Sequence, residues 1–105
     1  MDRVAMLNDI LTQNPKDEFA RYGLAMEYSK AGKVDEALEE FCKLLAVNPY
    51  YTAAYFMAAQ ALAGAQRVEE AKRMLSEGIA CAKRSGNSHA QSEMEAMLVD
   101  WDKDC

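Results

Sequence analysis

Few residues in this chain have the type and spacing that metal binding requires. His89 is the only histidine, and no second histidine or cysteine stands at ligand spacing from it. A zinc site needs several nitrogen or sulfur ligands together. We therefore interpret His89 as a residue near a helix N-terminus, and we expect no metal site and no cofactor.

The three cysteines are odd in number and widely spaced, and they form no C-x-x-C pair. This usage favours a reducing compartment over a disulfide framework, so we expect a cytoplasmic protein. Cys42 and Cys81 fall within predicted helices, where cysteine commonly acts as a small buried packing residue. Cys105 lies on the tail, where we expect it to be exposed.

The end of the chain, D-W-D-K-D, places Asp100, Asp102 and Asp104 at alternate positions, as a calcium loop does. Such a loop also needs a glycine and a bidentate glutamate further on, which the sequence lacks. A solvated acidic tail is the better interpretation. The chain has no glycine-rich phosphate loop, no G-x-S-x-G and no nucleophile beside a base, so we expect no catalytic residues and no enzyme.

Composition predicts one globular domain of 105 residues, since half of them are apolar and 28% are charged. The net charge is −5, and the 12 basic residues are scattered among 17 acidic ones, so the basic stripe of a nucleic-acid partner is missing. No run of about 18 apolar residues could span a bilayer, and the first residues are charged where a signal peptide is apolar. We expect neither nucleic acid nor membrane as a partner.

Apolar residues at helical spacing predict six helices. Proline or glycine ends most of them, and Ser88 to Gln91 reads as a capping box that opens the last one. The predicted ranges are about 2–13, 17–30, 34–47, 52–63, 68–84 and 88–102. The third of these helices has one apolar stripe, and the charged side chains on its other faces are expected to face water: Glu36, Glu39, Glu40 and Lys43.

The chain repeats itself with a period of 34 residues. The run Val34–Ala37 falls on Val68–Ala71 after this shift, and Phe41 falls on Leu75. The pair Asn48-Pro49 falls backward on Asn14-Pro15. A fixed period of this length is typical of a repeat array, in which each unit buries its apolar face against its neighbours.

Period and motif together resemble the tetratricopeptide repeat (TPR), and in particular a small bacterial-type TPR protein. The segment from Glu18 to Tyr51 matches one complete copy, with departures at Arg21, where a large apolar residue is usual, and at Leu44, where alanine is. The matching residues are Leu24, Ala25, Tyr28, Gly32, Ala37, Phe41 and Pro49. A second copy, Thr52 to Ser85, has Tyr55, Ala58, Ala59, Leu62, Ala71 and Leu75.

The resemblance implies an all-α fold of antiparallel helix-turn-helix repeats that form a short right-handed solenoid. A single domain, 1–105, is then expected, made of a half-repeat helix, two repeats and a C-terminal capping helix. Their ranges are 2–15, 18–51, 52–85 and 87–102. Met94 and Met97 are expected in the apolar face of the capping helix, and Met74 in the core of the array.

In TPR proteins the first helix of each repeat lines a concave groove for a peptide or a partner's helix. Carried over by position, the groove has Phe19, Tyr22, Met26 and Ser29 from one repeat and Ala53, Phe56, Gln60 and Ala63 from the next. With Met57 added as an adaptable side chain, the predicted peptide-binding residues are Phe19, Tyr22, Met26, Ser29, Ala53, Phe56, Met57 and Gln60. Co-chaperone members hold a terminal carboxylate with lysine and asparagine where this chain has Tyr22 and Met26. The expected ligand is therefore an apolar or aromatic segment of a protein partner.

Two alternatives stay open. Phe19, Tyr22 and Phe56 are also compatible with packing on one another or on a sister subunit. A homodimer or larger assembly would then use the same groove or the terminal helices, because a short solenoid leaves its apolar ends poorly covered. In either case the expected function is a non-enzymatic interaction module or scaffold.

Overall fold

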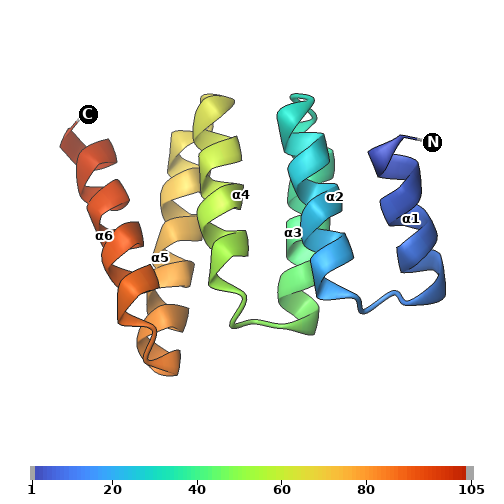
Figure 1. Ribbon diagram of the computed structural model, residues 1–105. Helices are drawn as coiled ribbons and strands as arrows, with labels where there is room; N and C mark the ends of the chain where they lie inside the picture. The colour runs from blue at the N-terminus through green and yellow to red at the C-terminus, as the bar shows by residue number, and fades with distance from the viewer. Residues whose placement is uncertain (1, 104–105) are drawn as a thin grey trace. The chain divides into compact units, whose positions relative to one another are not determined.

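The computed structural model describes residues 2–103, and over this range it contains six helices and no strand (Figure 1). The all-α fold with six helices is thus confirmed. The helices are α1 (Arg3–Gln13), α2 (Glu18–Lys30), α3 (Val34–Val47), α4 (Thr52–Gly64), α5 (Val68–Ser85) and α6 (Ser88–Lys103). The chain divides into two compact units, with the boundary between Pro49 and Tyr50.

Local sequence sets where the first two helices begin. The Asp2 carboxylate accepts the N–H of Ala5 at 2.8 Å, and the Asp17 carboxylate accepts the N–H of Ala20 at the same distance. Each aspartate thereby satisfies one of the unpaired N–H groups at a helix N-terminus and also suits the positive end of the helix dipole. The predicted start near Asp17 is confirmed, with Asp17 as the cap.

The turns that follow α2, α4 and α5 share one geometry. Gly32, Gln66 and Gly86 have φ values of +76°, +67° and +72°, in the left-handed region. In each turn the next residue donates its N–H to a carbonyl five residues back, as Lys33 does to Tyr28 at 2.9 Å. This is the Schellman pattern, which satisfies the last carbonyls of a helix. Gly32 and Gln66 occupy equivalent positions, 34 residues apart.

The first unit packs α2 against both α1 and α3. Leu7 and Leu11 of α1 are buried together with Ala20 and Leu24 of α2. On the other side of α2, the Phe41 side chain of α3 is fully buried. Figure 1 shows the three helices side by side and alternating in direction, so the half-repeat helix α1 serves as the outer neighbour of α2.

The second unit packs α4 against α5, and α6 packs on α5 and, to a smaller extent, on α4. Ala54, Ala58 and Ala59 of α4 have no exposed surface, so the small side chains allow the close approach that their spacing predicts. Met94 of α6 is 1% exposed, which confirms the expected apolar face of the capping helix. Lys72 of α5 also pairs with an aspartate of α6 at 3.1 Å.

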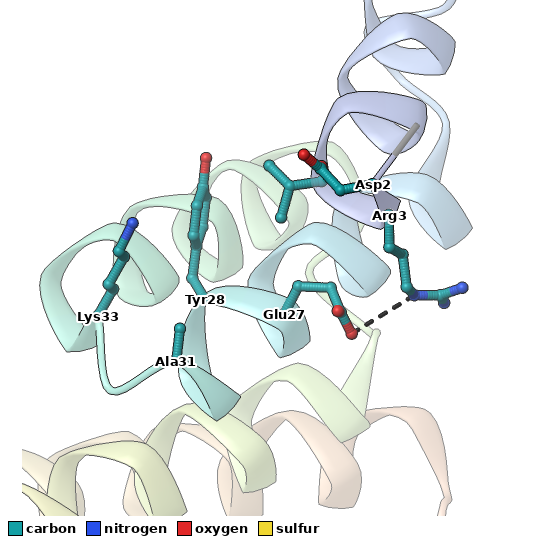
Figure 2. Close-up of a pocket in the computed structure, with 7 residues that line it drawn as sticks. Asp2, Arg3, Glu27, Tyr28, Ala31 and Lys33 are labelled. Carbon is teal, nitrogen blue, oxygen red and sulfur yellow. Dashed lines mark ion pairs between the residues drawn. The ribbon is translucent and has the colours of Figure 1, made fainter.

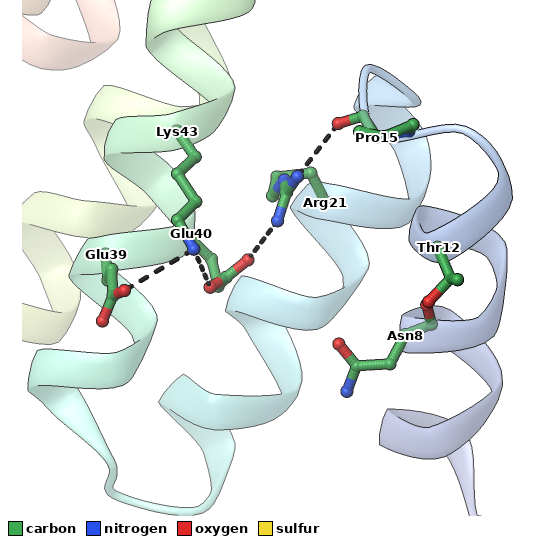
Figure 3. Close-up of polar contacts among 7 residues, drawn as sticks. All are labelled: Asn8, Thr12, Pro15, Arg21, Glu39, Glu40 and Lys43. Carbon is green, nitrogen blue, oxygen red and sulfur yellow. Dashed lines mark hydrogen bonds and ion pairs between the residues drawn. The ribbon is translucent and has the colours of Figure 1, made fainter.

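Glu40 was expected to face water, and this prediction is wrong. Its side chain is 10% exposed, and its carboxylate accepts a hydrogen bond from Arg21 Nη1 at 2.8 Å (Figure 3). Arg21 Nη2 also donates to the carbonyl of Pro15 at 2.9 Å. Arg21, the departure from the TPR pattern, thus links the loop before α2 to α3 and supplies the partner that the mostly buried Glu40 carboxylate requires.

Two further expectations need correction. Cys42 is exposed rather than buried, because it lies on the solvent side of α3, whereas Cys81 has no exposed surface. The cap of α6 is Asn87 and not Ser88. Asn87 Oδ1 accepts the N–H of Ala90 at 3.1 Å, because the left-handed Gly86 ends α5 and leaves the next residue in the capping position.

The acidic tail is only partly described. Asp100 is exposed as expected, but Asp102 forms the ion pair with Lys72 and so is not simply solvated. Asp104 and Cys105 lie outside the described residues.

Candidate functional site

Helix α2 carries four of the predicted binding residues on one face. Phe19 lies in its first turn and is 76% exposed, an unusual state for a phenylalanine, while the other three are half-buried. Those three are Tyr22, Met26 and Ser29. The spacing of three or four residues brings them into one row, as expected for a helix.

Tyr22 is held in place from behind by α3. Its ring meets the ring of Phe41 edge to face, with centroids 6.2 Å apart and an interplanar angle of 65°. This is a favourable aromatic geometry, and Phe41 itself is fully buried. The packing orients Tyr22 within the unit. Phe19, by contrast, is left open to solvent, so the alternative in which it packs away within its own unit does not apply.

Three predicted residues of α2 line one hollow of about 250 Å³ in the first unit. Its full lining is Arg3, Phe19, Tyr22, Gly23, Met26, Glu27 and Lys30. Gly23 brings the two helices together beside it, because a Cβ at this position would lie 3.4 Å from both methyl groups of Leu7. Because Gly23 has no side chain, it also leaves the hollow beside it unfilled.

One end of this hollow is charged. Glu27 pairs with Arg3 at 3.4 Å, drawn in Figure 2, and with Lys30 at 3.4 Å. A second hollow of about 370 Å³ shares Arg3 and Glu27 and is lined further by Asp2, Val4, Tyr28, Ala31 and Lys33. The beginning of α1 and the end of α2 thus bring several ionised side chains together beside an apolar surface.

The other predicted residues lie on α4, in the second unit. Phe56 and Met57 are half-buried there, whereas Ala53 and Gln60 are exposed. This set has one aromatic side chain, whereas the row on α2 has two.

His89 is exposed and lies 3.2 Å from the carboxylate of Glu93, one turn further along α6. Between residues 2 and 103, no three histidine, cysteine or acidic side chains are grouped as metal ligands would be. In the same range, no helix is both long and apolar enough to cross a membrane.

Sequence reasoning missed Arg3, Gly23, Glu27 and Lys30 as parts of the hollow. Gly23, Glu27 and Lys30 lie on the same face of α2 as Phe19, Tyr22 and Met26, so helical spacing alone could have identified them. Arg3 could not, because only the antiparallel docking of α1 on α2 brings it there.

The helix pairs, the 34-residue register and the turns all match one family. The family model for the tetratricopeptide repeat matches residues 28–92, more than half of the chain. The chain is a tetratricopeptide repeat protein. An uncharacterized protein of Methanocaldococcus jannaschii is 33% identical over 85 residues, covering 81% of this chain and 99% of that protein.

Solved structures support the same TPR fold. The solution structure of a protein from Bordetella parapertussis superposes with a TM-score of 0.84 at 21% identity, covering 99% of this chain and 90% of that one. A tetratricopeptide repeat domain protein from Salinibacter ruber gives a TM-score of 0.75 at 27% identity, covering 84% and 89%. TPR domains in general are protein-interaction modules without enzymatic activity.

Proposed function

We propose that this TPR protein binds an extended apolar or aromatic segment of a partner protein on the face of α2 that carries Phe19, Tyr22 and Met26. The observation that supports it is Phe19, which is 76% exposed beside a hollow walled by the other two side chains. A large exposed apolar side chain next to a concavity offers area that only a partner can bury.

The hollow suits one inserted side chain. Its volume of about 250 Å³ lies below the roughly 300–1,000 Å³ of pockets that hold a drug-sized molecule. Tyr22, fixed by Phe41, gives a rigid wall, and Met26 gives an adaptable one. A rigid aromatic wall loses little conformational entropy on binding, which strengthens the binding of an inserted side chain.

We propose the residues of α4 as a second, separate contact set. Ala53, Phe56 and Gln60 hold in the second repeat the positions that Phe19, Tyr22 and Met26 hold in the first. Met57 stands beside them on α4, and Ser29 extends the row on α2. The residues of α4 hold one aromatic side chain against two on α2, so we assign them a supporting share of the binding energy.

The test is capture of partners from a lysate of the source cells by wild type and by Phe19→Ser/Met26→Ser. We expect the double variant to lose most of the bound protein, since it removes apolar contacts without touching a fully buried residue. A matched variant on α3, Glu36→Ser/Cys42→Ser, should capture as wild type does, and circular dichroism should show unchanged helix content in both. Undiminished capture by Phe19→Ser/Met26→Ser would contradict the proposal.

Self-assembly is the second candidate function, and a specific observation favours it. Met6 and Ile10 of α1 are 47% and 43% exposed, on a helix whose other face packs on α2. A second copy could cover them. Sedimentation equilibrium over a wide concentration range would then give a dimer that Met6→Ser/Ile10→Ser reduces to the 11.7 kDa monomer. A monomer at every concentration would exclude this candidate.

A further inference from the structure

We infer that the segment bound in the hollow of α1 and α2 carries an acidic side chain besides its apolar one, and that Arg3 and Lys30 receive the carboxylate. This rests on the proposed function and deepens it, because it assigns the charge and the spacing of the ligand. The argument depends on how ionised groups are distributed at one end of the hollow.

Charges at that end do not balance. The hollow is lined by two cations, Arg3 and Lys30, and by one anion, Glu27, so one positive charge is in excess. The adjoining hollow adds Asp2 and Lys33, which cancel one another. The whole chain has a net charge of −5, so this local excess opposes the overall charge and marks a place where a carboxylate is favoured.

The two cations remain accessible to a ligand. The Arg3 side chain is 54% exposed and the Lys30 side chain is 72% exposed. The Glu27 side chain, which pairs with both, is 22% exposed. Glu27 contacts the Nε side of the guanidinium, and Figure 2 shows the two terminal nitrogens of Arg3 directed away from it. A guanidinium binds a carboxylate best through such a pair of terminal N–H groups.

Helix geometry sets the spacing of the two ligand groups. Tyr22 and Lys30 are eight residues apart on α2, and at about 1.5 Å per residue they are separated by about 12 Å along the helix axis. An extended segment rises about 3.3 Å per residue, so about four residues cover that distance. The expected ligand pattern is an aromatic or branched apolar residue and an acidic residue about four positions apart.

The experiment uses short peptides with acetylated and amidated ends, which exclude a terminal carboxylate as the source of charge. Each peptide of seven residues holds one phenylalanine and, four positions away, Glu, Gln or Lys in an alanine background, in both orders. Binding to the full chain is followed by nitrogen-15 NMR shifts of α1 and α2. We expect the Glu peptide to bind about three-fold more tightly than the Gln peptide at low salt, with a smaller ratio at high salt.

The variant Arg3→Gln/Lys30→Gln should bring that ratio to about one while phenylalanine-dependent binding persists. The control Lys83→Gln/Lys103→Gln changes the net charge equally in the second unit and should leave the ratio as in wild type. A wild-type protein that does not prefer Glu, or a preference that survives in Arg3→Gln/Lys30→Gln, overturns the inference alone. Absence of binding by every phenylalanine peptide at millimolar concentration overturns the proposed function as well.

Discussion

The two helix pairs, α2–α3 and α4–α5, share one register but fill the interface between their helices differently. Arg21 of α2 corresponds to Tyr55 of α4, and Glu40 of α3 corresponds to Met74 of α5, each 34 residues on. The first repeat uses an ion pair of 2.8 Å whose side chains are 17% and 10% exposed. The second repeat uses an aromatic ring beside the backbone of Gly78.

The difference shows that the repeat fixes backbone geometry and not the chemistry of the interface. A mostly buried ion pair gains little net free energy, since desolvation offsets much of the attraction, but either charge alone is costly. An aromatic ring gains more from burial, but it demands a small residue opposite. The interface residues of each repeat are therefore matched to one another. Exchanging a single residue between the repeats should lower the free energy of unfolding.

The largest effect is expected from exchanging the interface pair one residue at a time. Glu40→Met leaves Arg21 mostly buried without its carboxylate and should lower the free energy of unfolding by about 2 kcal/mol. Arg21→Tyr should cost less, because Lys43 lies 3.5 Å from Glu40 and retains a partner for it (Figure 3). The double variant removes both charges together and should lose less stability than Glu40→Met, although Leu44 stands where the second repeat has Gly78 opposite the ring. Urea unfolding of the four proteins measures the coupling. Additive losses would mean that the pair does not act as a unit.

The next largest effect is a difference in thermal stability between alanine substitutions at the helical glycines Gly78 and Gly23. A Cβ at Gly78 would lie 2.6 Å from Met94 Sδ and 2.7 Å from Tyr55 Cβ, whereas one at Gly23 would meet Leu7 methyls at 3.4 Å. Alanine gains about 1 kcal/mol in helix propensity at either position. Overpacking costs about 1–3 kcal/mol at Gly78 only. Thermal unfolding should therefore shift down for Gly78→Ala and up for Gly23→Ala. Shifts of the same sign would refute the contrast.

A smaller effect on stability is expected in the equivalent turns that follow α2 and α4. Gly32 and Gln66 both have positive φ, which costs a residue with a Cβ about 1 kcal/mol, and a Cβ at Gly32 would meet no atom within 4 Å. Gln66→Gly should therefore raise the free energy of unfolding by about 0.5–1 kcal/mol, and Gly32→Ala should lower it by a similar amount. Denaturant midpoints at constant slope provide the measurement. A destabilised Gln66→Gly would show that the Gln66 side chain contributes more than its strained backbone costs.

The smallest effect concerns pH. Burial, followed by the charge of Cys81, raises the pKa of Tyr55 above its ordinary value of 10.0. The folded state thus holds this proton more tightly, so the related stability is complete below pH 10 and falls as the pH rises past 10 toward the raised pKa. Tyr55→Phe should unfold with a shallower loss of stability between pH 9.5 and 11. Identical pH profiles for wild type and Tyr55→Phe would contradict this assignment.

Much of the candidate site could be predicted from sequence. The row of Phe19, Tyr22 and Met26 follows from helical spacing on a helix whose start and end are set by Asp17 and Gly32. Its exposure could not be predicted, because apolar spacing is the same for a core face and a binding face. Only the packing of Tyr22 on Phe41 and the open position of Phe19 separate the two.

The sequence by itself determined the six helices, their 34-residue register and the helix ends at Asp17, Gly32 and Gly86, because these depend on residues close together in the chain. Tertiary structure alone decided three other features. It buried Glu40 with Arg21, brought Arg3 of α1 to the hollow of α2, and pressed the backbone of Gly78 against Tyr55. Each of these features is a contact between side chains or backbone of different helices. Such contacts depend on how the helices pack and cannot be inferred from the positions of the residues along the chain.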